Sequence, residues 1–230
     1  MANAADMAAL TAAINDLLDL PASKQLLQLN SPTCERAFEA YVFALCGEAV
    51  RRAGGTFELW GIKSGPKPNP VVFRGAPGSM SSKKQNFAYA QCGLKQKRFE
   101  IHVDVEYQGT SGALHEIDVS LCEENHAEAV RSTGGTPKAA GKKLLMAFEC
   151  KFYESTPGVA LGRTFVGLIS DCGTLRLRAF VSNTPSEKLE QYLSRATRPE
   201  PFLGINPLAL ATEERFVSYV EQELRKWAPT

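Results

Sequence analysis

The chain has 230 residues, of which 44% are hydrophobic and 22% are charged. This length and composition suit a single α/β domain with a packed core, and they argue against two full domains or a disordered chain. The net charge of +1 excludes a strongly basic protein, so a partner with a phosphate backbone would need a local basic patch. No stretch approaches the roughly twenty apolar residues that a membrane span requires.

Six cysteines are spread along the chain without a C-x-x-C pair, and the first residues lack the basic start and long apolar run of a secretory signal. We therefore expect a reduced, cytoplasmic protein whose cysteines behave as small buried hydrophobes. These cysteines are Cys34, Cys46, Cys92, Cys122, Cys150 and Cys172.

Two helices are predicted at the N-terminal end. Apolar residues recur at helical spacing over residues 3–19, and Pro21 ends this first helix. A second helix is expected to begin near Ser31, a good N-cap, with Pro32 at the first helical position. The pair Gly54–Gly55 stops it.

A β-rich region follows, and strands then alternate with helices. Predicted strands cover residues 56–62, 71–74, 87–92, 98–107, 114–121, 143–153 and 175–181, and predicted helices cover 123–131, 159–169, 186–194 and 212–227. The segment 198–207 contains prolines and is predicted as a connection. This order favours a mixed central sheet flanked by helices, with strands 143–153 and 175–181 as parallel neighbours across a helical crossover.

Two charged side chains lie near the end of the most apolar predicted strand. Because side chains alternate along a strand, Glu149 and Lys151 share one face, while Phe148, Cys150 and Phe152 take the other. A buried carboxylate or ammonium is costly unless it is paired or bound to a metal. The simpler alternative is a salt bridge at an exposed strand end. A functional site is favoured because this is the only Glu-x-Lys in the chain.

The predicted strand 114–121 also carries acids among apolar residues. If the two strands pair, Asp118 faces Glu149 across the sheet. Two carboxylates at a strand edge make a hard oxygen site suited to Mg²⁺ or Mn²⁺, with the Cys150 carbonyl as an additional ligand. Such a metal would lower the pKa of a bound water and neutralise charge on a phosphate. Lys151 would orient or deprotonate that water and stabilise the transition state.

The pattern of Asp118 followed by Glu149-Cys150-Lys151 resembles the D-x(n)-E-x-K signature of the PD-(D/E)XK nuclease superfamily. The resemblance covers about residues 31–191. It implies a restriction-endonuclease-like core with an added N-terminal helix and a β-rich insertion, and a Mg²⁺-dependent endonuclease activity. Two features depart from the pattern: Ile117 rather than proline precedes Asp118, and thirty residues separate Asp118 from Glu149.

The same resemblance implies further roles. The segment Phe38–Val42 is similar to the first core helix of Mrr-type members, whose acid joins the metal site; this role falls on Glu39, with Glu35 a rival one turn earlier. A residue that touches the phosphate is common on the helix after the Glu-x-Lys strand, and Arg163 matches that position. The implied partner is a nucleic acid, with DNA favoured over RNA. A homodimer or higher homo-oligomer, and a host-defence (antiviral) or mobile-element setting, are implied as well.

We treat residues 1–230 as one nuclease-like domain. Residues 1–30 form a helical extension, 31–195 the core and 196–230 a C-terminal helix, and the two flanking helices are candidate dimer interfaces. Glu116 shares a face with Asp118 and is either a supporting acid or a solvated residue. Local basic runs together offer what a phosphate backbone needs: Lys63 and Lys67, Lys83–Lys84, Lys95 to Arg98, and Lys138 with Lys142–Lys143.

Two other hypotheses compete with a metal-dependent nuclease. One is a catalytically silent nuclease fold that binds nucleic acid or protein. The other is a structural domain in which Glu149 and Lys151 form only a salt bridge. The presence of Asp118, Glu149 and Lys151 together favours the enzyme, because drift would usually erase one of them.

Overall fold

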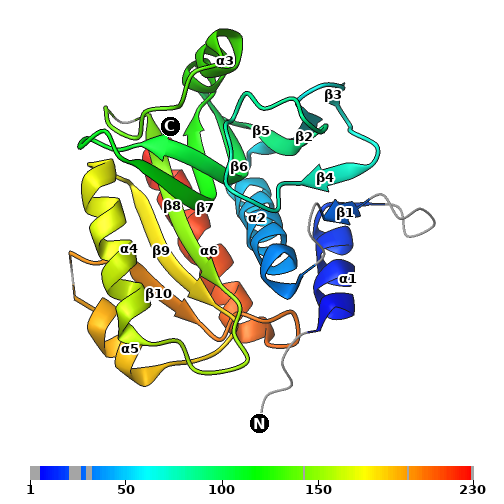
Figure 1. Cartoon of the computed structure of the whole chain (residues 1–230). Coiled ribbons are helices and arrows are strands. Elements are labelled where there is room, and N and C mark those ends of the chain that lie inside the picture. Colours follow the sequence, from blue (N-terminus) through cyan, green and yellow to red (C-terminus); the bar gives the residue numbers. More distant parts are fainter. Residues whose placement is uncertain (1–5, 21–26, 30–32, 142, 196, 229–230) are drawn as a thin grey trace.

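The computed structural model describes residues 6–20, 27–29, 33–141, 143–195 and 197–228. Within these residues the chain is an α/β protein built on an eight-stranded mixed sheet with helices on both faces (Figure 1). This confirms the predicted fold class at the level of sheet and layers. In the part of the chain that the structure describes, no helix combines the length and the apolar character needed to cross a membrane.

The elements follow the predicted order closely. The helices are α1 (Met7–Leu17), α2 (Cys34–Arg52), α3 (Glu124–Thr133), α4 (Val159–Cys172), α5 (Glu187–Leu193) and α6 (Leu210–Trp227). The strands are β1 (Leu27–Leu29), β2 (Thr56–Gly61), β3 (Gly65–Pro66), β4 (Val71–Phe73), β5 (Ala88–Leu94), β6 (Lys97–Gln108), β7 (Leu114–Glu123), β8 (Leu144–Lys151), β9 (Leu177–Ser182) and β10 (Glu200–Leu203). The short strands β1 and β3 were not predicted.

The large sheet has the strand order β10-β9-β8-β7-β6-β5-β2-β3, and β1 pairs with β4 in a separate ladder. From β3 to β8 neighbouring strands are antiparallel, whereas β8, β9 and β10 run parallel. The predicted crossover is confirmed, since α4 connects β8 to β9 and Glu149 pairs with Phe180. In the β7–β8 ladder Val119 pairs with Phe148, which places Asp118 beside Glu149 as the sequence predicted.

The prediction of a bare connection over 198–207 is wrong in part. Glu200–Leu203 form β10, which pairs in parallel with β9 at the edge of the sheet. Proline lacks a backbone donor and is therefore tolerated mainly on edge strands, and Pro201 occupies such a strand. The sequence prediction treated the prolines only as strand breakers and therefore missed the edge strand β10.

Two hydrophobic cores lie on opposite faces of the sheet. Helices α1, α2 and α6 contribute to the first core, and α3, α4 and α5 contribute to the second (Figure 1). Phe148 and Cys150 belong to the first core and Phe152 packs against it, as the alternation along β8 predicted. Buried large side chains on both faces hold the central strands in place. The middle of β7 and most of β8 are therefore packed on both faces.

Helices α2 and α6 are both integral to the first core. Helix α2 begins after Thr33, whose hydroxyl accepts a hydrogen bond from the Arg36 amide; the predicted cap Ser31 and Pro32 lie outside the described residues. The apolar face of α6 is buried, and the Phe216 ring lies 5.5 Å from that of Phe148. The C-terminal helix was named as a candidate dimer interface, but its apolar face is used inside this chain.

Candidate metal centre

The three residues of the predicted signature lie together, with Asp118 in the middle of β7 and Glu149 and Lys151 at the C-terminal end of the neighbouring strand β8. The Lys151 Nζ atom is 3.2 Å from Asp118 Oδ2 and 2.7 Å from Glu149 Oε1. The Cys150 amide donates to Asp118 Oδ2 at 2.7 Å, so Cys150 takes part through its main chain while its side chain lies in the core. Asp118 is thus held by one backbone and one side-chain donor.

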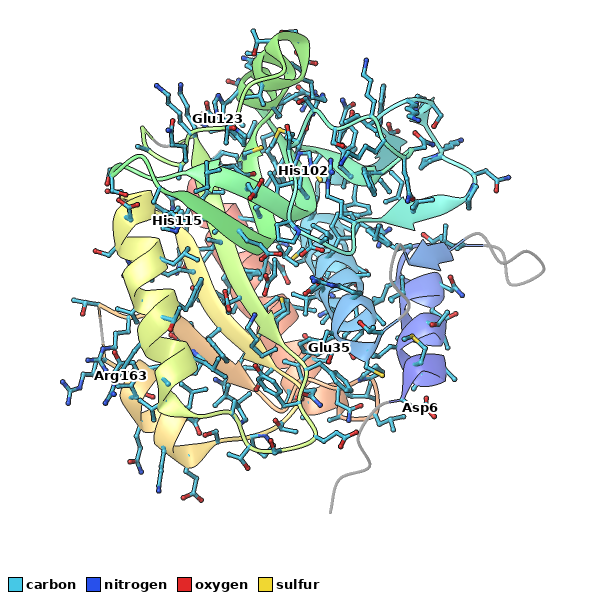
Figure 2. All side chains as sticks on the ribbon, in the orientation of Figure 1. Asp6, Glu35, His102, His115, Glu123 and Arg163 are labelled. Carbon is cyan, nitrogen blue, oxygen red and sulfur yellow. The ribbon has the colours of Figure 1, made fainter. Side chains whose placement is uncertain are left out.

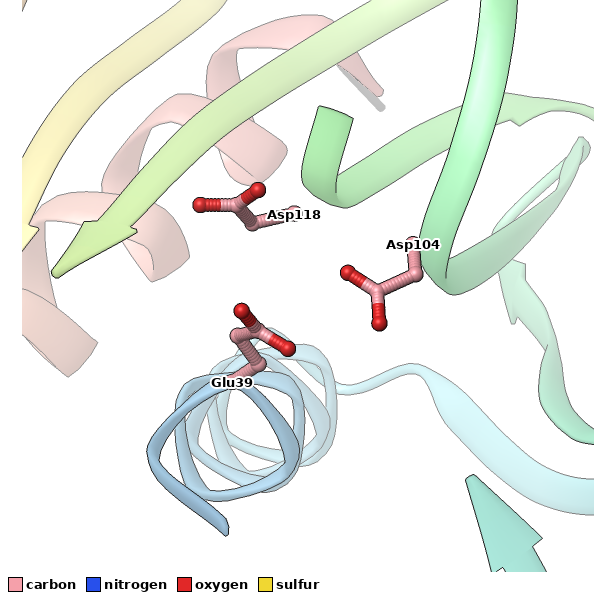
Figure 3. Close-up of side chains that lie close together, drawn as sticks. All are labelled: Glu39, Asp104 and Asp118. Carbon is pink, nitrogen blue, oxygen red and sulfur yellow. The ribbon is translucent and has the colours of Figure 1, made fainter. Parts of the chain in front are cut away.

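A second group of acids meets at the same aspartate. Carboxylate oxygens of Glu39 on α2, Asp104 on β6 and Asp118 on β7 lie within 4.8 Å of one another (Figure 3). All three residues are buried, with exposed fractions of 4%, 0% and 5%. Three carboxylates seldom gather out of water without a cation. Asp118 therefore belongs both to the Lys151 pair and to an acidic triad.

One arginine lies between two members of this triad. The Arg36 Nη1 atom is 3.0 Å from both Glu39 oxygens, and 3.3 and 3.2 Å from the two Asp104 oxygens. Arg36 precedes Glu39 by three residues, so both project from the same side of α2. Glu35, by contrast, is exposed (Figure 2). Of the two acids that the sequence left as rivals, the structure brings Glu39 to the cluster.

Asp104 is the residue that sequence reasoning missed. In the predicted strand 98–107, Asp104 alternates with apolar residues, a pattern typical of the polar side of a half-buried strand, whereas the structure buries both Asp104 and His102. Its backbone has φ of 51°, in the left-handed region, where aspartate is tolerated at a cost of about 1 kcal/mol. Gly78 N donates to the Asp104 carbonyl at 3.2 Å and supports this bend. Strain of this kind collects at functional sites.

Burial and mutual repulsion raise the pKa values of Glu39, Asp104 and Glu149. Burial, then the charges of Asp104 and Asp118, raise the pKa of Glu39 to about 9. Burial raises the pKa of Asp104 to about 7 despite the nearby Arg36. Burial and the charge of Asp118 raise the pKa of Glu149 to about 7. The cluster is therefore reluctant to hold all its negative charge at neutral pH unless another cation arrives.

The Lys151 ammonium responds in the opposite way. Burial alone would lower its pKa, but the carboxylates of Asp118 and Glu149 hold that pKa well above its ordinary value. Lys151 is consequently charged at neutral pH in the metal-free protein. Of the two roles that the sequence left open, this favours stabilising negative charge over removing a proton. Glu116, half-buried nearby, also has a raised pKa, caused by burial and then by Asp118.

The charges of the cluster do not balance. Four carboxylates, those of Glu39, Asp104, Asp118 and Glu149, contact two cations, Arg36 and Lys151, which leaves an excess of two negative charges when all are ionised. Hard carboxylate oxygens are the donors that Mg²⁺ and Mn²⁺ prefer. The residues therefore fit a divalent cation. Glu149, predicted as a ligand, is not one of the three acids within 4.8 Å, and Lys151 bonds to both it and Asp118.

Metal-free protein is expected to lose stability as the pH rises from about 5 to 9. Acids whose folded pKa exceeds the unfolded value stabilise the fold below the unfolded pKa, and this contribution is lost as pH passes the folded pKa, about 7 for Asp104 and about 9 for Glu39. Each unit of raised pKa corresponds to about 1.4 kcal/mol, so the expected loss is several kcal/mol. Urea unfolding in EDTA measures it. Asp104→Asn should flatten the slope, and an unchanged slope in that variant would contradict the prediction.

Arg163 is not brought to this cluster. It is exposed on α4, on the outer side of the helix (Figure 2), with its guanidinium carbon 5.9 Å from the Tyr192 ring centroid. The buried face of α4 carries Gly162, Phe165 and Ile169. A helix turns by about 100° per residue, so Arg163 points away from the face that begins at Gly162. The structure offers no contact between Arg163 and the acids.

Comparisons with protein-family models, with curated proteins and with solved structures found no match for this chain. Any function proposed for it consequently stands on the geometry of this centre and on the Asp118, Glu149 and Lys151 pattern.

Proposed function

We propose that this protein is a metal-dependent endonuclease that hydrolyses phosphodiester bonds, with DNA as its first expected substrate. The observation that carries the proposal is the shared position of Asp118. Its carboxylate lies 3.2 Å from the Lys151 ammonium and within 4.8 Å of carboxylate oxygens of Glu39 and Asp104. An acidic group beside a fixed cation suits a reaction in which a metal and an ammonium both face a phosphate.

We further propose a restriction-endonuclease-like core of the PD-(D/E)XK type. The supporting features are the helix α2, which carries Glu39, the antiparallel strands β6, β7 and β8, and the parallel crossover through α4 to β9. The acids come from α2, β6 and β7, and the Glu-x-Lys pair from β8. A homo-oligomeric state and a defence or mobile-element setting are proposals that follow from the same resemblance.

Each residue has a role in the proposed reaction. Glu39, Asp104 and Asp118 would hold the metal, which when bound supplies Lewis-acid stabilisation of the phosphate and a water of lowered pKa. The Lys151 ammonium faces negative charge that builds on the phosphate oxygens. Glu149, with its pKa near 7, is suited to accept the proton of the attacking water at its Oε atoms. The Cys150 amide fixes the orientation of Asp118.

The test is incubation of purified protein with supercoiled plasmid, linear duplex, single-stranded DNA and RNA. Each substrate is tested with Mg²⁺, with Mn²⁺ and with EDTA. We expect cleavage of at least one nucleic acid in either metal and none in EDTA. Binding without cleavage in every condition would overturn the proposal in favour of a silent nuclease-fold module. Cleavage that persists in EDTA would point to a different chemistry.

A further inference from the structure

The positive charge of this chain is concentrated in its β-rich part. Residues 56–100 contain eight lysines and arginines and two acids, a net charge of +6, while the whole chain carries +1 and the rest therefore −5. The basic residues are Lys63, Lys67, Arg74, Lys83, Lys84, Lys95, Lys97 and Arg98, and all but Arg74 are exposed. Residues 56–100 are thus strongly basic although the net charge of the whole chain is small. Attraction to phosphates depends on this local charge.

Three of these lysines come together from two loops. The Lys63 Nζ atom donates to the Lys84 carbonyl at 3.4 Å, which joins the turn after β2 to the loop before β5. Asn86 ties the same two segments together, because its Oδ1 accepts from the Lys63 amide at 2.9 Å and from the Ser64 amide at 3.1 Å. We call Lys63, Lys83 and Lys84 the cationic rim.

The rim borders a groove of about 390 Å³ between β2, β5 and α3. Its walls include Trp60, Ile62, Ser81, Lys83, Gln91 and Arg131. The Trp60 Nε1 donor is buried and is the one buried side-chain nitrogen or oxygen among the described residues that lacks a hydrogen-bond partner. The indole as a whole is half-buried and lines the groove, so its ring offers an apolar face on which an unpaired nucleobase can stack.

The loop that carries the rim also reaches the metal centre. Gly78 N donates to the Asp104 carbonyl at 3.2 Å, and Gly78 O accepts from the Glu106 amide at 3.1 Å. Five residues later the same loop supplies Lys83. Arg74, at the start of this loop, is buried over the Phe87 ring at 4.3 Å and donates to the Met80 carbonyl. The rim is therefore anchored to the backbone of a proposed metal ligand.

We propose that the cationic rim and the adjoining groove bind a single-stranded nucleic acid segment. The rim contacts its phosphates, and one base stacks on the Trp60 ring. An unpaired strand is specified because a base inside a duplex cannot present its face to a groove wall. The inference rests on the proposed function for the identity of the substrate, but strand binding is measured without any cleavage.

The test compares two charge-matched triple variants in EDTA. Lys63→Glu/Lys83→Glu/Lys84→Glu changes the rim, and Lys188→Glu/Arg195→Glu/Lys226→Glu makes the same charge change at exposed basic residues elsewhere. Fluorescence anisotropy with a labelled single-stranded oligonucleotide is recorded across salt concentrations. The rim variant should bind at least about tenfold more weakly, with a salt slope reduced by about 2 to 3, whereas the control should change about twofold or less. Equal weakening in both variants, or none in the rim variant, would overturn the inference.

Trp60→Ala is a second, independent variant. It removes the aromatic face and leaves the rim charge unchanged, so we expect oligonucleotide binding to weaken roughly tenfold with an unchanged salt slope. Competition by a free mononucleotide distinguishes a strand from a small ligand: millimolar competitor should displace little oligonucleotide, and full displacement at micromolar concentration would contradict a strand site.

The proposed function is tested separately by Mn²⁺-dependent hydrolysis of bis(p-nitrophenyl) phosphate by the wild-type protein. This small diester does not need the rim. Hydrolysis of the diester without rim-dependent strand binding would contradict the proposed strand site and leave the proposed nuclease activity standing. Rim-dependent strand binding without hydrolysis would contradict the nuclease activity and leave the strand site standing.

Discussion

Asp118→Asn is expected to weaken Mn²⁺ binding by at least about 100-fold. Asp118 is the one carboxylate shared by the acidic triad and the Lys151 pair, so its loss removes a ligand and releases the Lys151 contact. Asparagine has nearly the same shape and can still face the Cys150 amide with its carbonyl oxygen. The effect should therefore come from the lost charge and not from a disturbed core.

Isothermal titration with Mn²⁺ measures this loss, and α2 supplies a matched pair of controls. Glu39→Gln should lose affinity to a similar degree because Glu39 is buried in the triad. Glu35→Gln, one turn away and exposed, should bind Mn²⁺ as the wild type does. Equal behaviour of these two glutamine variants would show that the metal does not bind among Glu39, Asp104 and Asp118.

Arg36→Gln is expected to bind Mn²⁺ about tenfold more tightly than the wild type. The Arg36 guanidinium lies 3.0–3.3 Å from the oxygens of Glu39 and Asp104, so it occupies space next to the ligands that a metal needs. Two like charges at such separation repel by a few kcal/mol at an effective dielectric constant of about 20. A tenfold change in affinity corresponds to about 1.4 kcal/mol. The Arg36 side chain is 24% exposed and has a path to solvent when displaced.

The same titration, with Arg36→Lys and Arg52→Gln alongside, checks this competition. Arg36→Lys keeps the charge and should stay near the wild type. Arg52 lies exposed on the same helix and pairs with Glu48 and Glu214, so its substitution should leave Mn²⁺ affinity unchanged. Weaker binding in Arg36→Gln would mean that Arg36 holds Glu39 and Asp104 in position and does not compete with the metal.

Much of the fold, and the Asp118, Glu149 and Lys151 part of the metal centre, were predictable because they depend on local patterns. Alternation along β8 separates Glu149 and Lys151 from the core side chains Phe148 and Cys150, and the structure confirms this separation. The crossover from β8 through α4 to β9 follows from element order and from the handedness rule for parallel strands. The pairing of β7 with β8, which unites Asp118 with Glu149, follows once those strands are neighbours.

The parts of the centre that the sequence did not predict depend on contacts between segments that are distant in the chain. Asp104 reaches the triad through a left-handed backbone angle that no side-chain pattern reveals. Arg36 is a helix surface residue by sequence, and only the packing of α2 against β6 makes it the partner of Asp104. The placement of Arg163 at the centre could not be judged from the sequence for a related reason. The rotation of α4 about its axis is set by which of its side chains pack on the sheet.

We propose above that Asp118 is part of a metal-dependent phosphodiesterase centre. The most direct test of this proposal is single-turnover cleavage of end-labelled DNA in Mn²⁺ by wild type, Asp118→Asn and Glu35→Gln, purified identically. We predict that Asp118→Asn cleaves at least about 1,000-fold more slowly than the wild type, whereas Glu35→Gln matches the wild type. Equal cleavage rates for all three preparations would contradict the claim, because the reaction would then belong to another centre or to a contaminant.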